Sequence, residues 1–160
     1  MADSSKPLVY LILGATGSGR RQLLADLIQD GLAPEDRGAV MVSESEPPDA
    51  AFDEKLPRLT RWRWQDDRID GAWAEEATHV FFVADGSRDP VDQVEAFKPW
   101  LAIGGGELAR VLCIVDAQRA ERHPALLAWY EACVHFADIV LLNKREGVAN
   151  KWMSDFANHF

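Results

Sequence analysis

Short apolar runs alternate with longer amphipathic stretches along this chain. Continuous runs of apolar and β-branched residues, bounded by turn residues, predict strands that are buried on both faces. Such runs cover residues 8–13, 39–42, 79–84, 110–115 and 138–142, and a weaker alternating candidate covers 59–64. Apolar residues at helical spacing predict helices carried by Leu23, Leu24, Leu27 and Ile28, by Val91, Val94, Phe97 and Leu101, and by Leu126, Leu127, Tyr130 and Val134. Val148, Trp152, Phe156 and Phe160 recur at every fourth residue and predict a last helix with one apolar stripe.

This alternation of strands and helices predicts an α/β domain. In such a domain a mainly parallel sheet lies between two layers of helices. The 160 residues, 48% of them apolar, are enough for one hydrophobic core, and we expect a single domain over 1–160. The segment 44–55 contains Pro47-Pro48 and many acidic residues, so it is predicted to be an exposed, mobile loop.

The charge of the chain limits its partners. It has 17 Lys and Arg residues against 26 Asp and Glu residues, a formal net charge of −9. Because this excess of negative charge repels phosphate backbones and anionic lipids, we expect no nucleic-acid or membrane partner. Backbone amides can still hold a small anion locally. The polar start at 1–7 and the lack of a long apolar run indicate a cytoplasmic protein, in which Cys113 and Cys133 are reduced core thiols.

A glycine-rich segment follows the first predicted strand. Residues 14–19 read Gly-Ala-Thr-Gly-Ser-Gly and precede an amphipathic helix, which is the layout of a P-loop. Glycines let the backbone turn sharply and direct successive N–H groups at a phosphate, and the helix N-terminus adds its dipole. We therefore predict that Gly14, Gly17, Ser18 and Gly19 bind the phosphates of a nucleotide.

Two arginines replace the residues that complete a P-loop. Arg20 stands at the lysine position and keeps the positive charge on a longer, planar head group. Arg21 stands at the position of the Ser or Thr hydroxyl that binds Mg²⁺, and a guanidinium cannot ligate a cation. We predict that both arginines belong to the phosphate site and that Mg²⁺-assisted phosphoryl transfer is impaired. The alternative is a plain strand-to-helix turn with both arginines solvated.

A second motif follows the last predicted strand. Residues 143–146, Asn-Lys-Arg-Glu, are close to the Asn-Lys-x-Asp motif, in which a carboxylate accepts hydrogen bonds from the guanine N1–H and exocyclic amine. Asn143, Lys144 and Glu146 are thus predicted to recognise guanine, with Glu146 offering its oxygens on a stem one methylene longer. The alternative is a strand that ends in an ordinary polar turn.

An acidic residue also ends the strand predicted at 79–84. Asp85 is at the position of a Walker B carboxylate, which holds Mg²⁺ through water. An ordinary turn aspartate before Gly86 is the alternative, since Asp-Gly is a common turn pair.

The order of these motifs resembles the nucleotide-binding domain of the CobW-type metallochaperone GTPases, relatives of the urease and hydrogenase nickel-insertion GTPases. Residues 136–144 are similar to the Ala-Asp-x-x-x-x-Asn-Lys run of that family, and 111–117 to its strand ending in Val-Asp-Ala. Ser43 and Asp49 fall within the place of its switch segment. The resemblance implies a P-loop NTPase fold and a GTP or GDP ligand.

The chain departs from this family at the metal site. The Cys-x-Cys-Cys of the family follows its switch segment, whereas residues 61–67 read Arg-Trp-Arg-Trp-Gln-Asp-Asp and contain no thiol. The four histidines are scattered without ligand spacing, so no zinc site or other metal site is predicted. Together with Arg20, Arg21 and Glu146, these departures predict a degenerate, stand-alone relative without the C-terminal domain of the family.

Two functions remain open at this point. The first is a guanine-nucleotide-binding domain that hydrolyses GTP weakly or not at all. The second is a pseudo-GTPase that binds no nucleotide and presents a surface to a protein partner. The six tryptophans, with Trp62 and Trp64 on one strand face, support the second function because aromatic residues dominate interface hot spots. An active small-molecule kinase would need another set of phosphate-activating residues, which the sequence does not provide.

Overall fold

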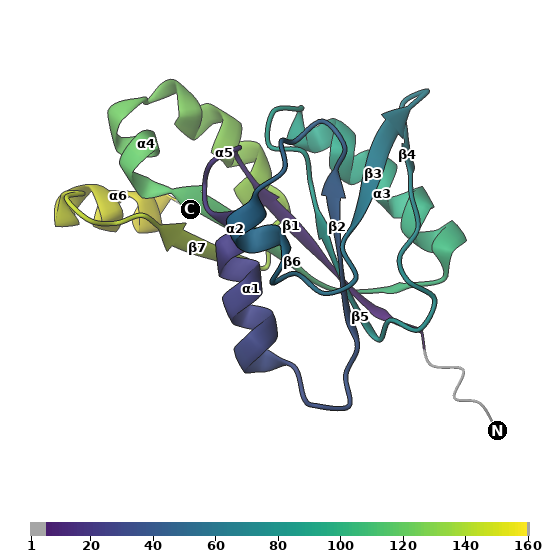
Figure 1. Ribbon diagram of the computed structural model, residues 1–160. Coiled ribbons are helices and arrows are strands. Elements are labelled where there is room, and N and C mark those ends of the chain that lie inside the picture. The colour runs from purple at the N-terminus through teal and green to yellow at the C-terminus, as the bar shows by residue number, and fades with distance from the viewer. Residues whose placement is uncertain (1–5, 160) are drawn as a thin grey trace.

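A seven-stranded sheet forms the middle of the structure, a computed structural model that describes residues 6–159 (Figure 1). The strands are β1 (Leu8–Gly14), β2 (Gly38–Ser43), β3 (Thr60–Gln65), β4 (Arg68–Asp70), β5 (His79–Val83), β6 (Glu107–Asp116) and β7 (Ile139–Asn143). The helices are α1 (Arg20–Gly31), α2 (Ala50–Asp53), α3 (Pro90–Gly104), α4 (Ala117–Arg122), α5 (Ala125–Phe136) and α6 (Asn150–His159). The predicted α/β architecture is confirmed, and every predicted strand is present.

The strand order is β4-β3-β2-β5-β1-β6-β7, and all neighbouring strands are parallel except β3 and β4. The central strand β1 pairs with β5 on one side and with β6 on the other. The carboxyl ends of the parallel strands therefore meet at one edge of the sheet. In open sheets of this kind, ligands bind at that edge where the chain turns from one side of the first strand to the other.

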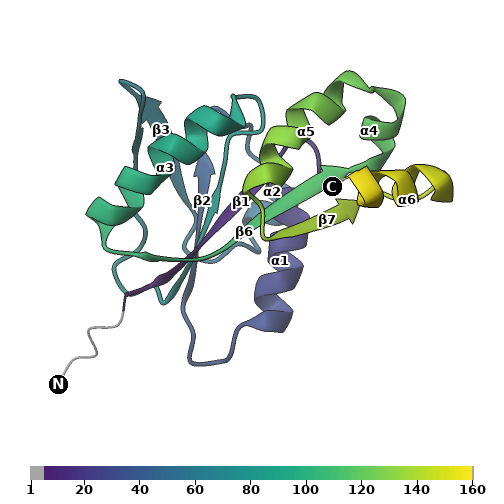
Figure 2. The same cartoon turned by 180° about the vertical axis from the view of Figure 1, so that it is seen from behind.

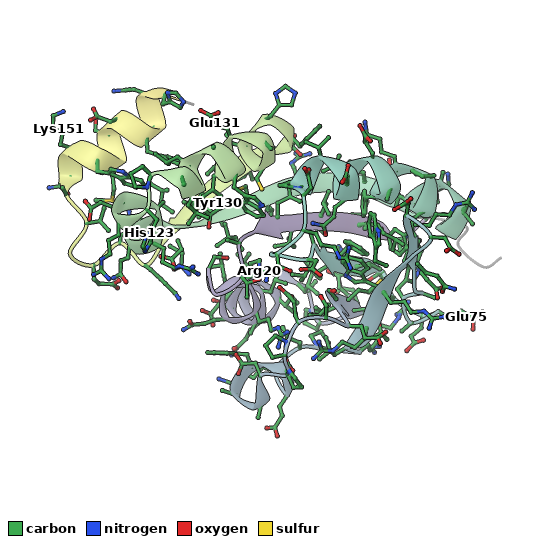
Figure 3. The ribbon with its side chains drawn as sticks, turned by 90° about the horizontal axis from the view of Figure 1, so that it is seen from above. Arg20, Glu75, His123, Tyr130, Glu131 and Lys151 are labelled. Atoms are coloured by element: carbon green, nitrogen blue, oxygen red, sulfur yellow. The ribbon has the colours of Figure 1, made fainter. Side chains whose placement is uncertain are left out.

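The helices form a layer on each face of the sheet. Figure 3 shows α3, α5 and α6 on one face and α1 with α2 on the opposite face, and Figure 2 shows the first group from behind. Because successive side chains of a strand point to opposite faces, each layer has its own core. Phe82, Phe97 and Tyr130 belong to the first core, and Leu24 and Ile114 belong to the second.

The predicted helices are present, but their apolar stripes are only partly buried. Leu27 of α1 and Val91 of α3 are 40% and 36% exposed. An apolar stripe spans little more than a quarter of a helix, and residues at its margin remain in water. Val148 is buried just before α6 begins, and Phe160 lies outside the described residues.

All six tryptophans lie within residues 6–159, and none of them is exposed. Trp62 is fully buried and donates a hydrogen bond from Nε1 to the carbonyl of Val83 at 2.9 Å. The other five are half-buried and pack against the first core: Trp64, Trp73, Trp100, Trp129 and Trp152. Core packing therefore accounts for much of the surface of the tryptophans, and a role of the half-buried ones in binding a protein partner stays a prediction.

The segment 44–55 is more ordered than predicted. Glu46 is buried, and the segment includes the short helix α2, which is capped by the side chain of Asp49. Pairing of these side chains with α1 explains the difference, since Arg21 of α1 lies 3.0 Å from Asp53 of α2. The elements β4 and α4 were not predicted, because they are too short to show a periodic spacing of apolar residues.

Two general expectations concern the remaining core and the membrane. Cys113 and Cys133 are buried free thiols, as predicted. A hydrogen bond with the Cys113 thiol, together with burial, raises the pKa of Cys133 far above its ordinary value. Among residues 6–159 no helix combines the length and the apolar character needed to cross a bilayer.

Candidate functional site

The segment between β1 and α1 has the backbone geometry of a phosphate-binding loop. Gly17 and Gly19 have φ values of +83° and +90°, which only glycine adopts without strain, and Ser18 lies between them. Alternation of left-handed and ordinary conformations turns successive N–H groups toward the same side of the backbone, a geometry that suits an anion. In this loop, however, the Thr16 and Ser18 N–H groups donate to the carbonyls of Gly86 at 3.4 Å and Ala15 at 3.1 Å, so these two amides are not open to a ligand. The backbone conformation therefore favours glycine at Gly17 and Gly19, and their binding of phosphate stays a prediction.

Three consecutive carbonyls of this loop accept hydrogen bonds from elsewhere in the fold. The Thr16 carbonyl accepts from Arg119 at 3.1 Å, the Gly17 carbonyl from Lys144 Nζ at 2.5 Å, and the Ser18 carbonyl from Asn143 Nδ2 at 2.9 Å. These donors come from α4, from the last residue of β7 and from the turn that follows it, so segments more than 100 residues apart hold the loop in shape.

The amides at the head of α1 are available to a ligand. Gly19 is the N-cap of α1 and makes no side-chain capping hydrogen bond. The first main-chain hydrogen bond of the helix runs from Leu23 N to Gly19 O, so the N–H groups of Arg20 and Arg21 have no acceptor inside the helix. Unpaired amides and the positive end of the helix dipole together suit a phosphate oxygen.

Arg20 does not behave as a solvated first-turn residue. It is 6% exposed and lies near the middle of the molecule in Figure 3, whereas Lys151 and Glu75 lie at the periphery. Its guanidinium forms an ion pair with Glu46 and donates to the carbonyl of Ala84 at the end of β5. The solvated alternative is therefore wrong for Arg20, and its charge is matched by a carboxylate of the protein itself.

Arg21 is also paired within the fold. Its guanidinium donates to Asp53 of α2 at 3.0 Å, and its side chain is 12% exposed. Asp53 has a second cationic neighbour, Arg61 of β3, at 3.6 Å. The solvated alternative is wrong for Arg21 as well, because this pair joins α1 to α2.

Asp85 lies at the carboxyl end of β5, as predicted, and is buried. Its carboxylate accepts hydrogen bonds from the Ser43 hydroxyl at 3.1 Å, from the Ser87 hydroxyl at 2.7 Å and from the Ser87 amide at 2.9 Å. The Ser45 hydroxyl also donates to it. Arg88 is 3.5 Å away. Burial favours the neutral acid, but the hydrogen bonds from Ser45, Ser87 and Ser43 outweigh it and lower the pKa of Asp85.

The residues at the expected Mg²⁺ position, Arg21 and Asp85, do not suit this metal. A bound Mg²⁺ needs oxygen ligands in an octahedral arrangement. Arg21 supplies no oxygen, and both carboxylate oxygens of Asp85 already accept hydrogen bonds from side chains of the protein. For metals in general, the described part of the chain contains no group of three or more His, Cys, Asp or Glu side chains that could hold an ion.

Of the three residues predicted to recognise guanine, two contact the P-loop and the third does not. Asn143 and Lys144 contact the P-loop, and Lys144 Nζ also lies 3.8 Å from Asp116 at the end of β6. Glu146 is exposed in the turn after β7, where its main-chain carbonyl accepts a hydrogen bond from Gln118 at 2.8 Å. Among the described residues, no hydrogen bond or ion pair joins the Glu146 side chain to the P-loop, so Glu146 is outside the network that joins Asn143 and Lys144 to it.

A cavity of about 510 Å³ opens between the P-loop and the segment that begins at Glu46. Its lining includes members of the loop, the first turn of α1, the α2 segment and the turn after β7: Thr16, Gly17, Gly19, Arg20, Arg21, Gln22, Glu46, Pro47, Pro48, Asp49, Ala50, Phe52 and Lys144. Five of the predicted site residues therefore meet at one cavity. Gly14, Ser18, Asp85, Asn143 and Glu146 are outside its lining.

Comparison with solved structures identifies the fold. The chain superimposes on the Zn(II)-bound YjiA GTPase from E. coli with a TM-score of 0.60 at 17% sequence identity, over 96% of this chain and 54% of that one. The chain therefore has the α/β fold of this GTPase over nearly its whole described length. A Zn(II)-bound triple mutant of YjiA gives a TM-score of 0.59 at 18% identity, over 95% of this chain and 53% of the other. This P-loop domain thus spans about half the length of the solved structures it matches.

No protein-family profile and no curated protein sequence matches the chain. The fold is therefore found through three-dimensional shape, and the sequence resemblance rests on short motifs. Sequence reasoning missed Glu46 and Arg119, because neither residue belongs to a recognisable motif. Asp116 was included only in the strand ending in Val-Asp-Ala, and here it caps α4 by accepting from Arg119 N at 3.0 Å.

Proposed function

We propose that this chain binds a guanine nucleotide through the amides of its P-loop and hydrolyses GTP weakly or not at all. The observation that carries the proposal is the loop at the head of α1. Gly17 and Gly19 have left-handed backbone conformation, the N–H groups of Arg20 and Arg21 have no acceptor inside the helix, and all four residues line a cavity of about 510 Å³. The fold shared with a GTPase supports a ligand of this class.

The affinity is expected to be modest, because the positive charges of the loop are already paired. Arg20 faces Glu46, and Arg21 faces Asp53. Each pair must loosen before its guanidinium can contact a phosphate, which opposes binding. The main-chain amides and the helix dipole then provide most of the attraction.

Slow hydrolysis follows from the donors at the Mg²⁺ position. In P-loop GTPases a Ser or Thr hydroxyl and a Walker B aspartate hold the metal that neutralises the developing charge. Arg21 replaces the hydroxyl, and Asp85 accepts hydrogen bonds from three serine hydroxyls. We therefore propose that nucleotide binding does not depend on Mg²⁺.

Guanine preference is proposed from the turn after β7. Asn143 and Lys144 join this turn to the P-loop, and Glu146 is exposed two residues further along the chain, which supports the proposal. A carboxylate can accept from the guanine N1–H, which adenine lacks. Titration with GDP and ADP tests this point, since Glu146→Ala should remove the difference between the two affinities.

Calorimetric titration with GDP tests the binding function. Gly17→Val should abolish saturable binding, because valine cannot adopt a φ of +83° and the loop must change shape. A side chain at Gly17 meets only Arg119 at 3.6 Å, so backbone conformation rather than collision is altered. Gly31→Ala is the matched control: Gly31 ends α1, and a Cβ there meets nothing within 4 Å.

A protein-interaction module without nucleotide binding is the second candidate. The ion pair between Arg20 and Glu46 favours it, because the charge that would meet a phosphate is neutralised within the chain. Flat calorimetric traces with wild-type protein at millimolar GDP would support this second function and contradict the first.

A further inference from the structure

We propose that Glu46 occupies, inside the P-loop site, the place of the terminal phosphate of a nucleoside triphosphate. The site then accepts a nucleoside diphosphate, and a triphosphate binds only after Glu46 has moved away. This inference rests on the nucleotide-binding function proposed above and specifies which nucleotide the site selects.

Two donors from different elements converge on one oxygen of Glu46. The guanidinium of Arg20 contacts Oε1, and the amide of Gly86 donates to the same Oε1 at 3.3 Å. Arg20 stands at the position whose cation reaches the β- and γ-phosphates in a P-loop. The oxygen that Arg20 contacts therefore marks the region in which the outer phosphates of a triphosphate would lie.

The carboxylate of Glu46 is buried, and one of its two oxygens has no hydrogen-bond partner among the described residues. The Glu46 side chain is 5% exposed, and burial of a carboxylate is costly unless it is paired. Its second oxygen, Oε2, is buried and has no hydrogen-bond partner among the described residues. The hydroxyl of Ser18 in the P-loop is likewise buried and unpaired. Of these two atoms, only Oε2 belongs to a residue that lines the cavity, so it is the one whose hydrogen bonding a ligand would complete.

The main chain around Glu46 is fixed by its own contacts. Arg61 of β3 donates to the carbonyl of Glu46 at 2.9 Å and to that of Ser43 at 3.0 Å. The Glu46 amide donates to the Ser43 carbonyl at 3.1 Å, which closes a tight turn after β2. This turn holds the carboxylate next to Arg20 while the remaining part of the cavity stays open.

A triphosphate would bring a further negative charge to the position of the Glu46 carboxylate. Like charges at contact distance repel, and the repulsion is stronger in a partly buried site than in water. A diphosphate can bind the loop amides without reaching Glu46. We therefore expect wild-type protein to bind GDP at least about tenfold more tightly than GTP, a free-energy difference of about 1.4 kcal/mol.

Calorimetric titration with GDP and GTP, in buffer containing a chelator, tests the proposal. Glu46→Ala should increase GTP affinity about tenfold or more and leave GDP affinity within about threefold, because the terminal phosphate replaces the missing carboxylate beside Arg20. Glu44→Ala is the matched control, since Glu44 is an exposed acidic residue of the same segment and should behave as wild type.

Thermal unfolding gives a second readout. Glu46→Ala leaves the buried Arg20 without its carboxylate, so the variant should unfold at a lower temperature, and GTP should raise that temperature more than it does for wild type. If Glu46→Ala does not fold, Glu46→Gln keeps the side-chain volume, removes the charge and should shift the preference in the same direction.

Equal wild-type affinities for GDP and GTP would overturn this inference and leave nucleotide binding intact. The same holds if GDP binds but none of the Glu46 variants gains affinity for GTP. If neither nucleotide binds to wild type or to the variants, both the inference and the proposed function fail.

Discussion

The buried ion pair between Arg20 and Glu46 allows the sharpest test of how the site is built. Arg20→Met keeps a long side chain but removes the positive charge. The Glu46 carboxylate, 5% exposed, would then keep only the hydrogen bond from the Gly86 amide at 3.3 Å. Removal of one partner from a buried pair leaves an uncompensated charge and costs about 3–5 kcal/mol of folding free energy.

Urea-induced unfolding at neutral pH, followed by tryptophan fluorescence, measures this loss. Arg122→Met is the matched control: Arg122 is exposed at the end of α4, and exposed substitutions change stability by less than about 0.5 kcal/mol. The double variant Arg20→Met with Glu46→Leu removes both charges and should be more stable than Arg20→Met alone, because no unpaired carboxylate remains in the interior.

A loss below about 0.5 kcal/mol for Arg20→Met would show that the ion pair with Glu46 does not stabilise the fold, because a loss of that size is expected for a solvated arginine. A double variant less stable than Arg20→Met alone would refute the charge explanation, since the loss would then come from side-chain packing.

Three further outcomes are expected from the surroundings of Tyr130, of Asp85 and of the two P-loop arginines. Burial raises the pKa of Tyr130 to about 12. The neutral phenol therefore contributes fully to the free energy of unfolding below pH about 10, and this contribution is lost as the pH rises toward 12. In urea denaturation at a series of pH values, Tyr130→Phe should lack this alkaline loss of stability. Burial alone would raise the pKa of Asp85, but hydrogen bonds from Ser45 and Ser87 lower it, so its contribution is present above pH about 4 and is lost as the pH falls through the lowered value. Acid unfolding of Asp85→Asn should lack this component, and an unchanged acid profile would contradict it. Arg20→Lys combined with Arg21→Thr should make GDP affinity sensitive to Mg²⁺ in calorimetry, whereas a chelator should not change the affinity of wild type.

The fold could be predicted because the strands and the longer helices each have a characteristic spacing of apolar residues in the sequence. The strands β1, β5 and β6 are continuous apolar runs, and such runs are typical of strands covered on both faces. The helices α3 and α5 have apolar residues at helical spacing. In contrast, β4 and α2 have three and four residues, and their ends are set by contacts with neighbouring elements rather than by a local pattern.

The site was only partly predictable for a related reason. The glycines of the P-loop are recognisable because the loop conformation demands them, and both Gly17 and Gly19 have positive φ. Glu46 was not recognisable, because a buried carboxylate needs a distant partner, and Arg20 lies 26 positions away. Its neighbours Pro47-Pro48 indicate a loop, so local composition predicted exposure where a long-range ion pair produces burial.

The central claim is that the amides of the P-loop hold a phosphate group. NMR amide spectra of ¹⁵N-labelled protein during titration with GDP test it most directly, because each N–H group is observed separately. We expect the largest chemical-shift changes at Gly17, Gly19 and Arg20, with saturation at one equivalent of bound nucleotide. Changes confined to residues distant from this loop, or unchanged amide signals at millimolar GDP, would contradict it.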